Sequence, residues 1–215
     1  MASVNYQKKI IYIHLPKTAG SYIQHILLKN YEFIPYNYLC FEYKNCVFSY
    51  KDKSIVKYYN DPEILDLISL SQDKIKEFKK FTFVRNPYHR FISAWQFMME
   101  KGFISKNTTI NELIINRDKY DGLVYNHIFV SQTEHLEGWN FDEIGKFENI
   151  EEDLKFILRD YGFNISHIPS KKNETKDYGD PSQYYSKEFL EFINSNFNDD
   201  FLNFGYEKIL KLNDY

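Results

Sequence analysis

The chain has 215 residues, of which 43% are hydrophobic and 27% charged, a balance typical of a soluble globular protein and not of a disordered one. Its formal net charge is −3, whereas proteins that bind nucleic acid polymers usually carry a basic excess, so we expect no such partner. The N-terminus lacks the apolar core of a signal peptide, and no apolar run reaches transmembrane length. We therefore expect no membrane span and a cytoplasmic location.

The first elements in chain order are a strand, a loop and a helix. Residues 10–14 form an apolar, β-branched run that predicts a buried strand. Residues 15–21 predict a turn, and apolar residues then recur at helical spacing up to about Asn30. Residues 46–50 predict a further strand, and a helix is expected to begin at Asp61 with Pro62 in its first turn.

A second strand, turn and helix follow. Residues 81–84 predict a strand, and Asn86 can cap a helix that has Pro87 at its first position. Further elements are expected as helices at 111–117 and 121–134, a strand from Ile144 to Glu148, and helices at 150–158 and 186–197. Strands that alternate with helices indicate an α/β fold, with a mostly parallel central sheet flanked by helices. We expect a single domain over residues 1–215.

The first loop has the composition of an anion-binding site. Unpaired N–H groups and the helix dipole favour an anion at a helix start, and Gly20 allows close approach of the backbone. Thr18 and Ser21 add hydroxyl donors, and Lys17 adds a positive charge. The loop is not a Walker A motif, because G-x-x-x-x-G-K-[ST] is absent. An ordinary βα turn is the alternative.

A second candidate site follows the strand at 81–84. Arg85 stands at the carboxyl end of that strand, where open α/β sheets bind ligands. Ser93 lies about two helical turns further on, and an arginine fork with a hydroxyl suits a second anion. The alternative for an arginine is pairing with a surface carboxylate, which is the role we expect for Arg90.

Taken together, the two segments resemble the 5′-phosphosulfate loop and the 3′-phosphate motif of sulfotransferases that use 3′-phosphoadenosine-5′-phosphosulfate (PAPS). The resemblance is to the carbohydrate O-sulfotransferases of the heparan-sulfate 2-O and chondroitin type, and it extends over roughly residues 10–207. It continues through residues 126–133, 144–154, 167–175, 184–185 and 200–206.

This resemblance implies a P-loop-like three-layer fold, PAPS as co-substrate, adenosine 3′,5′-bisphosphate (PAP) as product, and no metal. It implies a 5′-phosphosulfate site made by Lys17, Thr18, Ala19, Gly20 and Ser21. It also implies a 3′-phosphate site at Arg85 and Ser93, and a covering loop that contains Lys171, Lys172, Asn173 and Thr175. Lys17 would stabilise charge on the leaving phosphate, because in-line transfer through a loose transition state depends on positioning and electrostatics.

The general base is left open by the sequence. Many family members carry a histidine upstream of the second motif, but residues 30–80 contain none. Asp52 falls near that place, and Glu42 is the candidate by analogy with other branches. His14 and His127 are further candidates, although a structural hydrogen bond is the expected role of His14.

The sequence therefore predicts a sulfotransferase that moves a sulfuryl group from PAPS to a hydroxyl, on a glycan or another acceptor. Two alternatives stay open. One is a nucleotide kinase or other phosphotransferase that uses the same loop. The other is a silent protein that binds PAPS or PAP without transfer.

Overall fold

The computed structural model describes residues 2–36, 76–120, 122–165, 168 and 180–211. Contacts group the chain into two compact units, each of which is described by itself. The first unit consists of Met1–Leu15, Ala19–Phe83 and Asn140–Ser170. The second consists of Pro16–Thr18, Val84–Trp139 and Lys171–Tyr215. The single domain expected from the sequence stays a prediction.

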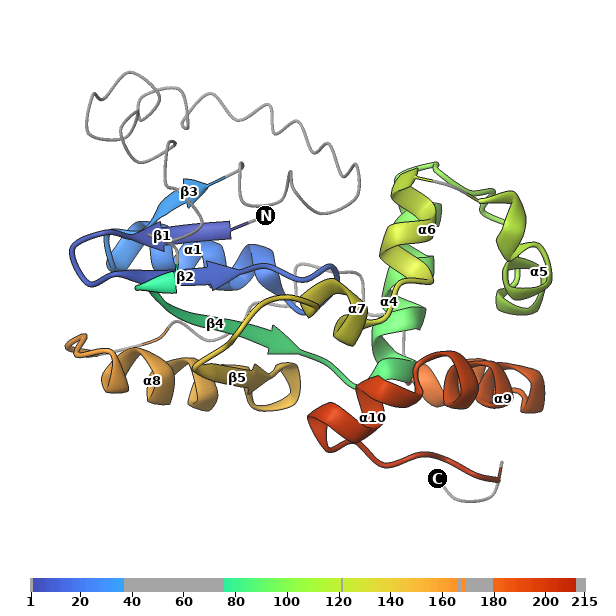
Figure 1. Cartoon of the computed structure of the whole chain (residues 1–215). Coiled ribbons are helices and arrows are strands. Elements are labelled where there is room, and N and C mark those ends of the chain that lie inside the picture. Colours follow the sequence, from blue (N-terminus) through green and yellow to red (C-terminus); the bar gives the residue numbers. More distant parts are fainter. Residues whose placement is uncertain (1, 37–75, 121, 166–167, 169–179, 212–215) are drawn as a thin grey trace. The chain divides into compact units, whose positions relative to one another are not determined.

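The first unit is built on a five-stranded sheet of order β3-β1-β2-β4-β5 (Figure 1). The strands are β1 (Ala2–Asn5), β2 (Ile10–Ile13), β3 (Ile34–Tyr36), β4 (Lys79–Val84) and β5 (Glu143–Lys146). β2 and β4 are parallel, with Ile10 beside Lys79, as the strand–helix alternation predicts. β1 pairs antiparallel with both β2 and β3. These two antiparallel additions at one side of the sheet were not expected from the sequence.

Two helices cover one face of this sheet. α1 (Gly20–Asn30) and α8 (Ile150–Asp160) contribute apolar residues to the same core as Tyr12, Phe81 and Phe83. The Tyr12 and Phe81 rings lie 5.1 Å apart between their centroids. Alternate strand residues point to opposite faces, and Ile11 and Thr82 on the other face are also buried. Both faces of the central strand pair are therefore shielded from water, as in an α/β layer fold.

The sequence did not predict β1, because its alternate residues are polar and do not indicate a buried strand. Ser3 and Asn5 are nevertheless buried, and their side chains find partners. Asn5 Nδ2 donates to the Tyr31 carbonyl at 2.8 Å, and Gln24 Nε2 donates to Ser3 Oγ at 3.2 Å. A polar side chain can be buried when its hydrogen bonds are satisfied, which a sequence pattern does not reveal.

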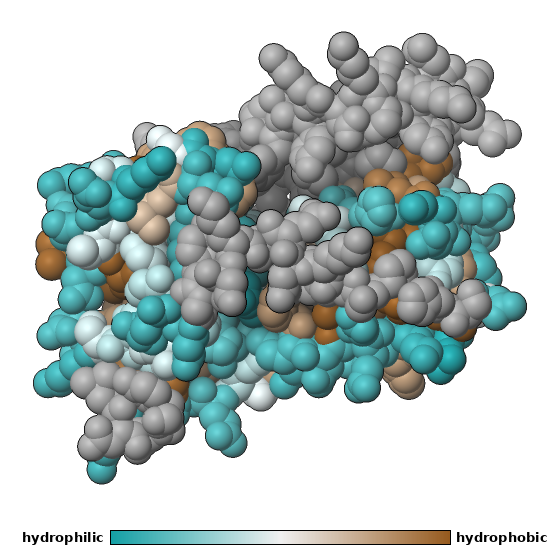
Figure 2. Space-filling view, turned by 180° about the vertical axis from the view of Figure 1, so that it is seen from behind, coloured by the Kyte–Doolittle hydropathy of each residue, from teal (hydrophilic) through white to brown (hydrophobic). Residues whose placement is uncertain are grey.

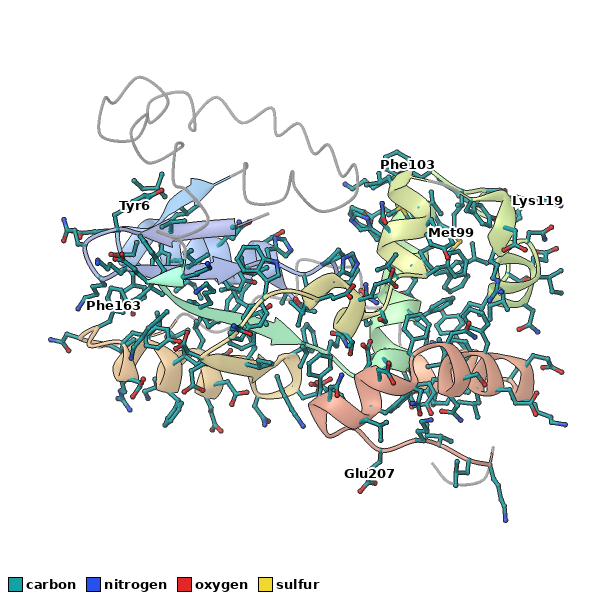
Figure 3. All side chains as sticks on the ribbon, in the orientation of Figure 1. Tyr6, Met99, Phe103, Lys119, Phe163 and Glu207 are labelled. Carbon is teal, nitrogen blue, oxygen red and sulfur yellow. The ribbon has the colours of Figure 1, made fainter. Side chains whose placement is uncertain are left out.

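The second unit is helical in the part of the chain that the structure describes. Its α-helices are α4 (Pro87–Glu100), α5 (Ile110–Ile115), α6 (Gly122–Ile128), α7 (Gln132–Leu136), α9 (Lys187–Asn196) and α10 (Asn198–Phe204). Short 3₁₀ turns are η3 (Arg117–Lys119) and η5 (Pro181–Tyr184); a third, η4 (Phe147–Asn149), belongs to the first unit. The core is aromatic, with Tyr88, Phe91, Phe189 and Phe201 packed together. Met99 on α4 packs against this core (Figure 3).

Side-chain caps mark the starts of α4, α5, α7 and α9. Asn86 accepts hydrogen bonds from the Tyr88 and His89 amides, as expected for a cap before Pro87. The single helix expected at 121–134 is wrong: α6 and α7 are separate, because Ser131 caps a new start by accepting from the Glu134 amide. The strand expected to reach Glu148 ends at Lys146. α10 was not expected at all.

The described surface is mainly hydrophilic on the face shown in Figure 2, with scattered hydrophobic areas. Isolated exposed apolar side chains such as Ile115 and Leu202 are ordinary on protein surfaces. Across the described residues, no helix combines the length and apolar character that crossing a bilayer demands.

Candidate active site

The loop from β2 into α1 has two non-glycine residues with left-handed backbone. Lys17 has φ 68° and Ala19 has φ 61°. For residues with a Cβ this conformation costs on the order of 1–2 kcal/mol each, and such strain clusters at ligand sites. Pro16–Thr18 groups with the second unit and Ala19 with the first. The strained backbone lies where the sequence predicts phosphate binding.

The start of α1 is open to an anion. No side chain caps it, its N-cap residue is Ala19, and its first turn contains no acidic residue. Every other α-helix whose N-cap the structure describes has a side-chain cap or an acidic first turn. Because helix-start N–H groups need acceptors, an uncapped and acid-free start suits a bound phosphate or sulfate.

Gly20, the first residue of α1, is in close contact with His14 of the same unit. A Cβ built on Gly20 would lie 1.9 Å from His14 Cδ2. The His14 ring is stacked at 6.4 Å from the Tyr12 ring. The contact with His14 thus explains why a glycine stands at position 20, in addition to the close ligand approach expected from the sequence. His14 packs beside the loop.

We expect Gly20→Ala to destabilise the protein by about 1–3 kcal/mol, because the new methyl overlaps the His14 ring. Urea unfolding of Gly20→Ala, His14→Ala and the double variant measures the coupling. The double variant should be more stable than the sum of the single changes predicts. Strict additivity would mean that the His14 contact is not the reason for the glycine.

Lys17 is held against α4 within the second unit. Its Nζ lies 4.2 Å from the centroid of the Phe97 ring, a cation–π contact. Burial lowers the pKa of Lys17 to about 8, and the neighbouring charges of Arg85 and Lys101 act in the same direction, whereas Glu100 opposes them. Lys17 is therefore a poorly solvated cation that stays protonated at pH 7. A bound anion would compensate the positive charge of Lys17.

Arg85 lies just before α4, and Ser93 lies within that helix. Arg85 follows the last residue of β4, is partly exposed, and its Nη1 donates to the Lys17 carbonyl at 3.4 Å. Ser93 is half-buried, and it shares a helix face with Phe97 because the two are four residues apart. Lys17 rests on that same ring. The second unit thus brings the Lys17 side chain to Phe97 and its carbonyl to Arg85, and Ser93 lies one helical turn before Phe97. The roles of all three predicted site residues remain predictions.

The expectation for Arg90 is wrong. Arg90 is 1% exposed, so it is not the surface arginine that the sequence led us to expect. Its guanidinium donates to three carbonyls, those of Pro16 at 3.3 Å, Val130 at 3.0 Å and His127 at 3.4 Å. Burial lowers its pKa to about 10, and the charge of Asp200 opposes this shift. Arg90 is a buried support for the loop that carries Lys17.

Of the candidate bases, His14 and His127 are described, whereas Asp52 and Glu42 lie outside the described residues. His127 Nδ1 is 3.0 Å from the Leu123 carbonyl, so Nδ1 carries the proton and donates it. Burial is the main cause that lowers the pKa of His127 to about 4, and the charges of Arg90 and Lys17 act in the same direction. Its ring stacks on Phe97 at 6.0 Å. A neutral imidazole therefore shares the ring on which Lys17 rests.

The remaining predicted site residues differ in burial, and some lie outside the described part of the chain. Thr18 is fully buried and Ser21 is exposed at the start of α1. Lys171, Lys172, Asn173 and Thr175 lie outside the described residues. A pocket of the second unit is lined by Asn86, His89, Asp180, Ser182, Tyr185 and Ile209. Of the residues predicted to hold the nucleotide, none that the structure describes lines this pocket.

No metal site is apparent among the residues that the structure describes, since no three His, Cys, Asp or Glu side chains gather there. Metal-free chemistry stays a prediction.

The chain runs from a strand through a cationic loop with left-handed backbone into an uncapped helix, which is the local arrangement of an α/β protein whose helix start favours an anion. The model of the sulfotransferase family matches residues 2–207. The chain therefore belongs to the sulfotransferase family. No curated protein sequence matches it.

A solved structure, that of a sulfotransferase from Alicyclobacillus acidocaldarius, is similar to 93% of this chain and 96% of its own length. The TM-score is 0.52 and the sequence identity is 15%, a likeness that concerns the fold. The predicted α/β, P-loop-like fold is confirmed.

Proposed function

We propose that this protein transfers the sulfuryl group of PAPS to a hydroxyl group of a carbohydrate. Membership of the sulfotransferase family supports sulfotransfer. The observation that carries the choice of donor lies within the second unit, where the Arg85 guanidinium donates to the Lys17 carbonyl. In chain order these two cations follow β2 and β4, which are parallel neighbours. A nucleotide with phosphate groups at both 5′ and 3′ positions needs two such anion sites.

The donor supplies the sulfuryl group and leaves as PAP. In our proposal its 5′-phosphosulfate is held by Lys17, Thr18, Ala19, Gly20 and Ser21. Its 3′-phosphate is held by Arg85 and Ser93, with the loop of Lys172, Asn173 and Thr175 over it. Lys17 neutralises charge that builds on the leaving phosphate, as a pre-positioned cation in a poorly hydrated place does most effectively.

The acceptor is proposed from the resemblance of the sequence motifs to the carbohydrate O-sulfotransferases. For the general base, Asp52 remains the sequence-based proposal. His127 is the described alternative, because its Nδ1 donates to the Leu123 carbonyl and burial keeps the imidazole neutral.

Calorimetric titration with PAP tests the nucleotide site, and Arg85→Ala is the decisive variant. We expect micromolar binding by the wild type and a loss of about 100-fold in Arg85→Ala, which removes charge-assisted hydrogen bonds to a phosphate. Folded wild-type protein that prefers ATP with magnesium would refute the proposal. Tight PAP binding without transfer to a broad panel of glycans would favour a silent binding protein.

The affinity for PAP should depend on pH through Lys17. Lys17 binds the anion only when protonated, and its pKa is about 8, so half of it is neutral at pH 8. The affinity is therefore expected to change little up to about pH 7 and to decline through pH 8. Titrations from pH 6.5 to about 9.5 measure this decline. Lys17→Arg, which stays charged throughout, should bind with no decline in this range. An identical decline in Lys17→Arg would assign the titration to another group.

A further inference from the structure

Two fully buried side chains, Gln132 and Asp200, hold the main chain of Arg85. The Arg85 amide donates to Gln132 Oε1 at 2.8 Å, and Gln132 Nε2 donates to the Arg85 carbonyl at 2.8 Å. One side-chain amide thus pairs with both backbone groups of a residue, as a neighbouring strand would. Both Gln132 and Asp200 have no exposed surface.

Asp200 fixes the orientation of that amide. Its Oδ2 accepts from the Gln132 backbone amide at 2.9 Å and from Gln132 Nε2 at 3.3 Å. Its Oδ1 accepts from the Thr133 amide at 2.7 Å, at the start of α7. A flipped Gln132 amide would put its oxygen against the carboxylate of Asp200 and the carbonyl of Arg85, so only one orientation satisfies all partners.

The clamp, formed by the side chains of Gln132 and Asp200, acts at the junction between β4 and α4. Val84 is the last residue of β4, so Arg85 is the first residue after the strand. Asn86 already belongs to the next element as the cap of α4. The segment with Gln132-Thr133 and the segment that begins at Asp200 are remote in sequence, yet they converge on this single residue.

We propose that Gln132, oriented by Asp200, is a positioning residue that fixes the backbone of Arg85 and thereby its hold on a ribose 3′-phosphate. This inference rests on the proposed function, in which Arg85 contacts that phosphate. A pre-organised arginine binds without the cost of being ordered on ligand binding. Loss of the clamp should therefore weaken recognition of the 3′-phosphate selectively.

The test compares PAP with adenosine 5′-monophosphate (AMP), which lacks the 3′-phosphate. For Gln132→Met we expect an affinity for PAP about tenfold weaker and an affinity for AMP within about twofold of wild type. Arg85→Ala should lose more of the same preference. Gln24→Met is the matched control, since it also removes a buried amide hydrogen bond but lies in the first unit. It should leave the PAP preference unchanged.

In Gln132→Glu we expect the PAP preference to recover at low pH, which a general loss of stability would not produce. This variant tests the clamp if Gln132→Met does not fold. The ionised carboxylate that this substitution introduces cannot donate to the Arg85 carbonyl, and it repels Asp200. Protonation restores one donor, and burial beside a carboxylate favours protonation. Relative to wild type at each pH, the PAP preference of Gln132→Glu should recover as pH falls from 8 to about 6.

The outcomes separate the two proposals. Wild-type protein that binds neither nucleotide would refute the proposed function. Wild-type binding that is lost in Arg85→Ala, but is kept in Gln132→Met and in Gln132→Glu at every pH, would refute only the clamp. Equal losses of PAP and AMP affinity in Gln132→Met, with no recovery at low pH in Gln132→Glu, would also refute it.

Discussion

Lys17→Met is expected to lower the rate of PAP release from PAPS at least 100-fold while leaving the protein at least as stable as the wild type. A single preorganised donor to developing charge is worth about 100- to 1,000-fold in rate. Methionine keeps the contact with Phe97 through its apolar, flexible side chain. It also removes a cation whose pKa is lowered by burial, so the fold loses a poorly solvated charge.

The measurement is PAP release with a glycan acceptor or water as recipient, together with thermal unfolding of each variant. Lys101→Met is the matched control, because Lys101 Nζ lies 5.7 Å from the same Phe97 ring but belongs to the end of α4 and not to the loop. Its rate should stay within about twofold of wild type. Full activity in Lys17→Met would remove Lys17 from the chemistry.

Arg90→Met is expected to cost at least about 3 kcal/mol of stability, the largest structural effect among these variants. The carbonyls of Pro16, Val130 and His127 would lose their donor, and the buried carboxylate of Asp200 would lose a compensating charge. For a chain of this length the loss corresponds to a fall in Tm of roughly 6–12 °C.

Urea or thermal unfolding followed by circular dichroism measures this effect. Arg117→Met is the control, because Arg117 is exposed and its contact with Asn196 is on the surface. Its stability should change by about 0.5 kcal/mol or less. Equal stabilities of the two variants would mean that the buried guanidinium contributes no more than a surface arginine.

Arg90 and Gln132 show why the candidate site was only partly predictable. The sequence alone does not show whether an arginine is exposed to solvent or donates to three buried carbonyls, as Arg90 does. Its burial depends on the elements that pack around it. Gln132 acts on Arg85, 47 residues away in the chain, and no local pattern encodes such a pair. Its signal in the sequence was only the resemblance of residues 126–133 to a family segment.

The local elements, in contrast, followed from the sequence. The β-branched run before Leu15 predicted β2, and the Asn86-Pro87 pair predicted the start of α4, because strand preference and capping act between near neighbours. The loop with Lys17 and Gly20 was predicted to bind a phosphate, since a helix start after a strand has defined electrostatics, and that role stays a prediction.

The sequence by itself therefore determined the α/β class, the strand, turn and helix order around the Lys17 loop, and the family resemblance. Only the tertiary structure decided that β1 joins the sheet, that His14 packs against Gly20, and that Lys17 rests on Phe97. The physical reason is the separation along the chain over which each interaction acts. Capping, periodicity and turn preferences are short-range properties of the chain, whereas burial, charge compensation and side-chain clamps depend on residues that only folding brings together.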